Sequence, residues 1–134
     1  MIYETLISLS LVLAQLQDEL QNRKQPIESI EEKALDKLIQ CESKGNETAV
    51  NYEDAKVNKL PSFGILQFSP YTLLNAAKRY NLIPQSFTLK EILAMRFNSS
   101  FQKEVARNLL ADGEWRHWRT CSIKTGMNLI AFNY

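Results

Sequence analysis

Three helix-start signals divide this chain and restrict it to a mainly helical fold. Ser29 to Glu32 (SIEE) and Thr88 to Glu91 (TLKE) are capping boxes, in which a hydroxyl and a carboxylate each accept a backbone N–H at the start of a helix. Ser69-Pro70 places a capping serine before a proline, which suits the first helical position because its missing N–H needs no partner there. The length of 134 residues suits one domain with a short appendage, and 45% apolar residues can form a core.

Apolar residues at helical spacing follow each of these signals. Gly45 is expected to end a helix over about 29–43, whose inward stripe is Ile30, Ala34, Leu35, Leu38 and Ile39. Further helices are expected over 70–80, 88–95 and 98–112, followed by a last helical turn within 114–121. Residues 44–62 lack periodicity and are predicted to be a long loop, a kind of segment that often carries function. The segment SFGILQF (62–68) should be a small strand or a turn, and 126–134 a strand or an extended tail.

The first 26 residues differ from the rest. Their apolar residues alternate spacings of four and three, which is the heptad pattern of helices that pack on one another: Ile2, Leu6, Leu9, Leu13, Leu16 and Leu20. Gln25-Pro26 is predicted to end this helix, which gives an amphipathic helix over 1–26 and a domain over 27–134. The stripe favours self-association through residues 2–20. Alternatively, the run from Leu6 to Ala14 belongs to an export segment, and no run is long enough to span a membrane.

The charges are unevenly distributed along the chain. The net charge is only +1, yet residues 55–90 contain no Asp or Glu and carry Lys56, Lys59, Lys78, Arg79 and Lys90. Such a stretch either attracts an anionic polymer or is a solvated basic face. We favour the solvated face and expect no nucleic-acid partner.

Two cysteines and one histidine limit metal and thiol chemistry. A structural zinc site needs four Cys or His ligands, so we expect no metal and no cofactor. Cys41 and Cys121 either form a long-range disulfide, which would indicate an oxidising compartment, or remain unrelated thiols. In the second case a cysteine nucleophile with His117 as base would make a thiol hydrolase, because Cys121 follows His117 by four residues.

Glu42 lies at the predicted C-terminal end of the helix over 29–43, next to Cys41. That end of a helix carries partial negative charge, and an apolar wall beside it would disfavour the carboxylate further. Both effects raise the pKa and keep a proton on the carboxyl near neutral pH. A protonated glutamate in a groove is what cleavage of a glycosidic bond requires, because the leaving oxygen must receive a proton. The alternative is an ordinary solvated carboxylate at a helix end.

Four segments favour the catalytic interpretation of Glu42 over the solvated one: CESKGN, SFGILQFSPYT, QKEVARNLLADGEW and HWRTCS. Together, over about residues 28–122, they resemble the resuscitation-promoting factors, secreted bacterial cell-wall enzymes of the lysozyme and lytic transglycosylase superfamily. In that family a Cys-Glu-Ser pattern ends the first helix, a Gly-Leu-Gln-Phe-like segment follows, and a threonine opens the next helix. The resemblance implies a mainly α, α+β lysozyme-like fold, in which a short β-like segment lies beside the catalytic helix.

The resemblance also assigns roles to individual residues. It implies that Glu42 is the catalytic glutamate, that Gly64 and Gln67 line the sugar groove, and that Thr72 forms the groove wall. Cys41 and Cys121 match the pair that forms a disulfide in the family. The tryptophan that commonly follows the threonine is replaced here by Leu73, and Tyr71 is the candidate for the missing stacking surface.

The activity that the resemblance implies is cleavage of the MurNAc-GlcNAc β-1,4 bond in peptidoglycan glycan strands, by a secreted or cell-envelope enzyme. One glutamate can perform both proton transfers, first to the glycosidic oxygen and then from the substrate's own 6-hydroxyl, which gives an anhydro-sugar. Of the loop carboxylates Glu47, Glu53 and Asp54, we expect Asp54 to assist at most. The alternative is a glycan-binding module that keeps the fold and has lost catalysis.

Overall fold

The computed structural model describes the backbone of residues 2–126 and the side-chain surroundings of residues 9–17 and 32–126. The chain forms two compact units, Met1–Lys33 and Ala34–Tyr134, each described below by itself. The expected strand or extended tail over 126–134 lies outside the described residues, apart from Gly126. None of the helices described is long and apolar enough to cross a membrane.

Helix α1 (Ile2–Ser43) is continuous, so two predictions from the sequence were wrong. The helix does not end at Gln25-Pro26, and Ser29 lies inside it instead of capping a new one. An internal proline removes one backbone hydrogen bond and costs about 3 kcal/mol, which weakens a helix without always ending it. The flanking residues are mostly Gln, Glu, Lys, Leu and Ala, which have high helix propensity and favour helix on both sides.

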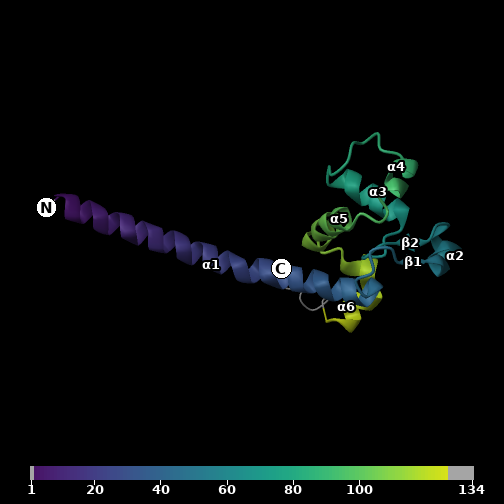
Figure 1. Ribbon diagram of the computed structural model, residues 1–134, viewed down its shortest axis with the longest axis horizontal. Helices are drawn as coiled ribbons and strands as arrows, with labels where there is room; N and C mark the ends of the chain where they lie inside the picture. Colours follow the sequence, from purple (N-terminus) through teal and green to yellow (C-terminus); the bar gives the residue numbers. More distant parts are fainter. Residues whose placement is uncertain (1, 127–134) are drawn as a thin grey trace. The chain divides into compact units, whose positions relative to one another are not determined.

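After α1 the chain forms a small helical domain with one hairpin (Figure 1). Strands β1 (Val50–Asn51) and β2 (Ser62–Phe63) pair antiparallel, with Val50 opposite Phe63 and Asn51 opposite Ser62. Between them the expected loop contains two short helices, η1 (Tyr52–Asp54) and α2 (Ala55–Asn58). The remaining elements are α3 (Pro70–Arg79), α4 (Leu89–Ala94), α5 (Ser99–Ala111), η2 (Trp115–Trp118) and α6 (Arg119–Lys124). The prediction of a mainly helical domain with a short β segment is confirmed.

The helix starts of this domain follow the expected capping chemistry. Thr88 and Glu91 form the predicted capping box of α4, in which the Thr88 hydroxyl accepts the Glu91 N–H and the Glu91 carboxylate accepts the Thr88 N–H. The Asn98 side chain accepts the Phe101 N–H at 3.0 Å and starts α5. Pro70 opens α3 as predicted, although the Ser69 side chain makes no capping hydrogen bond.

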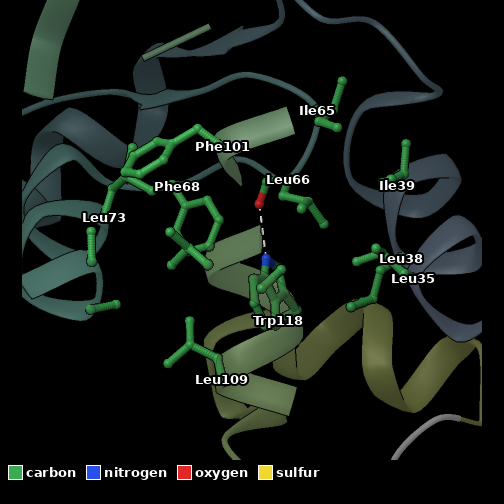
Figure 2. Close-up of a cluster of buried hydrophobic side chains, with 14 of the residues drawn as sticks. Leu35, Leu38, Ile39, Ile65, Leu66, Phe68, Leu73, Phe101, Leu109 and Trp118 are labelled. Atoms are coloured by element: carbon green, nitrogen blue, oxygen red, sulfur yellow. Dashed lines mark hydrogen bonds between the residues drawn. The ribbon is translucent and has the colours of Figure 1, made fainter. Parts of the chain in front are cut away.

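One core joins the end of α1 to α3, α5 and η2 (Figure 2). Leu35 and Leu38 of α1 are almost fully buried with Leu66 and Leu109. Trp118 is also buried, and its indole N–H donates to the Leu66 carbonyl oxygen at 2.8 Å. This bond satisfies the polar edge of a large core residue and fixes the turn after β2 against η2. Trp115 is buried too.

Cys41 and Cys121 form a disulfide with a Cα–Cα distance of 5.7 Å, as the resemblance implied. The bond joins the last turn of α1 to α6, and the two cysteines are 80 residues apart in sequence. The chain has no free cysteine, so no thiol is available to act as a nucleophile. The thiol hydrolase hypothesis is therefore wrong.

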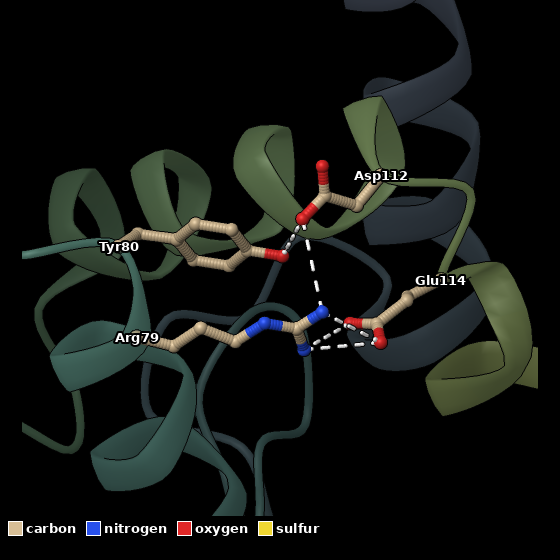
Figure 3. Close-up of polar contacts among 4 residues, drawn as sticks. All are labelled: Arg79, Tyr80, Asp112 and Glu114. Carbon is tan, nitrogen blue, oxygen red and sulfur yellow. Dashed lines mark hydrogen bonds and ion pairs between the residues drawn. The ribbon is translucent and has the colours of Figure 1, made fainter.

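A polar cluster connects the end of α3 to the segment after α5 (Figure 3). Arg79 donates to both carboxylate oxygens of Glu114, with a shortest distance of 2.8 Å, and lies 3.8 Å from Asp112. The Tyr80 hydroxyl donates to Asp112 at 2.6 Å, and burial together with this bond raises the pKa of Tyr80 to about 12. Lys56 is also paired, with Glu53 at 2.8 Å. These pairs reduce the free positive charge of residues 55–90.

Candidate functional site

A cleft of about 310 Å³ opens beside the end of α1 within the Ala34–Tyr134 unit. Its walls come from the last turn of α1, the hairpin with its short helices, the start of α3, and η2. The lining residues are polar and aromatic: Glu42, Asn51, Asp54, Asn58, Ser62, Gln67, Phe68, Ser69, Thr72, His117 and Trp118. No Lys or Arg is among them.

Glu42 enters this cleft because α1 ends immediately after it. Lys44 and Gly45 both adopt left-handed backbone conformations, with φ of 56° and 78°. The Lys44 N–H donates to the Gln40 carbonyl at 3.1 Å and closes the last turn. Glu42 therefore lies in the final helical turn, half-buried, as predicted from the sequence.

The surroundings of Glu42 favour its neutral form. Burial raises its pKa from 4.5 to about 7, and the negative charge of Asp54 contributes in the same direction. Among the described side chains, none donates a hydrogen bond to the carboxyl or forms an ion pair with it. The last turn of α1 contains no basic residue that would offset the partial negative charge of the helix end. A half-buried carboxyl that holds its proton near pH 7 can act as a general acid.

Asp54 reaches the cleft from the short helices between the two strands. The Asn51 side chain accepts the Glu53 N–H at 3.1 Å and starts η1, at whose end Asp54 lies. Asp54 is half-buried, and its carboxylate caps no helix. The nearest cation in sequence, Lys56, pairs with Glu53 instead. Asp54 is thus the second carboxylate of the cleft, as the sequence led us to expect.

The turn after β2 forms the wall that carries Gln67. Phe63 and Phe68 exchange two backbone hydrogen bonds of 3.0 and 3.1 Å, which close a tight loop. The Gln67 side-chain N–H₂ donates to the Gly64 carbonyl at 2.8 Å and to the Ala49 carbonyl at 3.3 Å. Gln67 has a φ of 53°, which is unusual for a residue with a side chain. Its amide group therefore holds the turn together as well as lining the cleft.

Gln102 of α5 supports this turn from the core side. It is 1% exposed, and its side-chain oxygen accepts the Leu66 N–H at 3.0 Å. Its amide nitrogen donates to the carbonyls of Phe63 and Arg96, at 2.9 and 2.7 Å. All the main hydrogen-bonding capacity of a buried amide is thereby used, which makes the turn and α5 one rigid assembly.

Residue 64 must be glycine because the side chain of Gln102 lies against it. Its φ is +83°, a conformation that strains any residue with a Cβ. A Cβ at this position would overlap the amide of Gln102. Gly64 is buried and is not among the residues that line the cleft. Gly64 therefore meets a packing requirement of the turn. It does not line the groove, as the resemblance implied that it would.

We expect Gly64→Ala to destabilise the protein by about 2–4 kcal/mol, because backbone strain adds to the displacement of a fully hydrogen-bonded amide. Gly113→Ala is the matched control, since Gly113 has a similar φ of +75° but nothing within 4 Å of the added Cβ. Urea unfolding of both variants measures the difference. Equal losses in the two variants would show that the Gln102 contact has no energetic role.

The structure sorts the predicted site residues into two groups. Glu42, Asp54, Gln67 and Thr72 all line the cleft. Gly64 lies beneath it, and Tyr71 is 43% exposed on the first turn of α3 without being a lining residue. Leu73 is buried in the core.

Sequence reasoning missed His117 as a cleft residue. Its side chain is exposed, and it also lines the cleft. Its ring meets Trp118 edge to face at 5.9 Å, and Trp118 meets Phe68 in the same way at 5.4 Å. No spacing rule connects residue 117 to residue 42. Gln102 did leave a signal, because it shares a helix face with the inward residues Val105 and Leu109.

The raised pKa of Glu42 makes folding stability depend on pH. The folded state binds the proton more tightly than the unfolded state, so this stabilisation is complete below pH 4.5 and is lost as the pH rises through about 7. Glu42→Gln removes the ionisation. We expect its melting temperature to exceed that of the wild type by ~3 °C at pH 8 and to match it near pH 4. Glu47→Gln, an exposed control, should show no such difference, and parallel curves for Glu42→Gln would contradict the assignment.

The described residues contain no group of three or more His, Cys, Asp or Glu side chains that could hold a metal ion. The lining of the cleft offers two carboxyls, one imidazole and a set of amides and hydroxyls. Comparison of the chain with models of protein families, with curated proteins and with solved structures found no match.

Proposed function

We propose that this protein cleaves the glycan strands of bacterial peptidoglycan at the MurNAc-GlcNAc β-1,4 bond, with Glu42 as the general acid and base. The observation that carries this proposal is a half-buried carboxyl in a cleft, with its pKa raised to about 7. The resemblance to the resuscitation-promoting factors supplies the substrate class. The confirmed Cys41–Cys121 bond agrees with it.

In the proposed reaction Glu42 donates its proton to the bridging oxygen while the bond from that oxygen to the sugar C1 breaks. The electron pair leaves with the oxygen, and positive charge develops at C1. The carboxylate of Asp54, in the same cleft, stabilises that charge. Glu42, now ionised, takes a proton from the hydroxyl that attacks C1. Water as the attacking group gives a reducing end, and the 6-hydroxyl of the same sugar gives a 1,6-anhydro end.

The other lining residues suit a neutral, hydroxyl-rich and amide-rich polymer. Asn51 and Asn58 can hydrogen-bond to sugar hydroxyls and N-acetyl groups. The Gln67 side-chain oxygen can accept from them, whereas its N–H groups donate to the turn. Ser62, Ser69 and Thr72 add hydroxyls, and the edges of Phe68 and Trp118 add apolar surface. This mixture of polar groups on an aromatic wall is what orients a small ligand in a pocket.

We further propose that the domain has a lysozyme-like fold and works outside the cytoplasm, in the secreted fraction or at the cell envelope. Two features support this. The glutamate ends a helix that is followed directly by a β-hairpin, and the cleft lies between them. The disulfide fits an oxidising compartment.

Digestion of purified sacculi by the wild-type protein tests the proposal. We expect soluble muropeptides, and mass spectrometry of their ends then distinguishes water from the 6-hydroxyl as the attacking group, because the two products differ by one water. Binding to sacculi without release of fragments would refute the enzymatic proposal and favour the glycan-binding module. Absence of both binding and release would exclude peptidoglycan as the ligand.

A further inference from the structure

The Met1–Lys33 unit exposes an unusual density of large apolar side chains. Between residues 9 and 17 these side chains are 50–62% exposed: Leu9, Leu11, Val12, Leu13 and Leu16. Extensive exposed apolar surface on a protein usually marks an interaction site. The cleft proposed for catalysis is formed entirely by residues of the other unit, so it does not account for this surface.

A helix of this kind needs a partner to be stable. The unit contains only α1, and isolated helices in water are marginal because most helical stability in proteins comes from packing of the apolar face. The stretch from Leu9 to Gln17 reads LSLVLAQLQ, in which β-branched Val12 and Ser10 lower intrinsic helix propensity further. Packing of the leucines on another surface is therefore required to hold the helix.

A lipid surface fits this helix poorly. Helices that lie on membranes carry Lys and Arg on their polar face, which attract anionic headgroups. Residues 1–22 contain no Lys or Arg and carry three acidic residues, Glu4, Asp18 and Glu19. Their charge would repel an anionic membrane.

A second helix with the same repeat fits well. The spacing of Leu9, Leu13 and Leu16 continues in sequence through Leu6 and Leu20, which gives alternate a and d positions of a heptad repeat. Glu19 and Lys24 are five residues apart in the sequence, at g and e positions of this register. In a parallel pair of identical helices, a g position faces the e position five residues on in the partner, so these opposite charges match.

We propose that residues 2–20 pair with the same residues of a second copy of this chain in a parallel coiled coil. The apolar a and d residues pack between the two helices, and the acidic charges lie outside the seam. The proposal is independent of the proposed catalysis, because it concerns a different unit and a different measurement.

The chain offers a matched pair of variants. Leu13 is 56% exposed and lies on the stripe, whereas Leu11 is 62% exposed and lies about 160° away around the helix, at an f position. Leu13→Glu and Leu11→Glu introduce the same charge two residues apart on one helix. A coiled coil distinguishes them, since only the first buries the new carboxylate between two helices.

Light scattering coupled to size-exclusion chromatography of the full chain provides the test. At about 100 µM, where mass action favours association, we expect a mass of two chains for the wild type and for Leu11→Glu, and of one chain for Leu13→Glu. The fluorescence of Trp115 and Trp118, both in the other unit, reports whether the domain is folded in each variant. A monomeric wild type, or equal masses for the two variants, would overturn the proposal.

Discussion

Glu42→Gln is expected to lower the rate of muropeptide release from sacculi by about 10²–10⁴-fold, the usual contribution of a positioned general acid or base. Glutamine fills the same space and can still hydrogen-bond to the substrate, but it has no proton to give to the leaving oxygen. The pKa of about 7 also predicts how the rate of the wild type depends on pH. Its rate should fall as the pH rises above 7, because ionised Glu42 cannot act as the acid.

Two control variants separate this role from simple charge effects. Glu47→Gln removes an exposed carboxylate five residues later that does not line the cleft, and its rate should be unchanged. Asp54→Asn keeps the proton donor and should retain part of the activity, while its rate declines at a lower pH than in the wild type, because the negative charge that raises the pKa of Glu42 is gone. Full activity of Glu42→Gln would rule out the mechanism.

The helices of the domain were predictable because their start and stop signals are local. Thr88 and Glu91 are three residues apart, and a capping box needs nothing else. Gly45 similarly marked the end of α1. The helix end predicted at Pro26 was wrong because two opposing free energies decide it. The hydrogen bond lost at proline destabilises the helix, while the helix propensity of many neighbouring residues stabilises it, and the sequence does not show which is larger.

Residues of the cleft could be predicted only where they belong to a motif that is visible in the sequence. Glu42, Gln67 and Thr72 lie in segments whose chemistry or family pattern is visible in sequence, and all three line the cleft. His117 belongs to η2, which reaches the cleft through the packing of Trp118 on Leu66 and Phe68. Contacts between residues about fifty positions apart are set by the whole core, so no local pattern encodes them. Gly64 was expected to line the groove, but it packs against Gln102, a neighbour that the sequence could not locate in advance.

Replacing both cysteines, as Cys41→Ser with Cys121→Ser, is expected to destabilise the protein by about 4–5 kcal/mol. The bond closes a loop over a sequence separation of 80 residues, and its loss restores the corresponding freedom to the unfolded chain. For a domain of this size the melting temperature should fall by on the order of 20 °C. Because Cys41 precedes Glu42 and is tied to α6, we also expect the variant to lose glycan cleavage at temperatures where the wild type is still active.

Reductant supplies the control for this prediction. Dithiothreitol should lower the melting temperature of the wild type to that of the double-serine variant, and should leave the variant itself unchanged, because it has no disulfide to reduce. Agreement between the two routes separates loss of the cross-link from any effect of serine in a buried position such as Cys121, which is 6% exposed. A reduced wild type that melts within about 4 °C of the oxidised protein would mean that the cross-link contributes less than about 1 kcal/mol. The end of α1, with Glu42, would then be held in place mainly by the packing of Leu35, Leu38 and Ile39.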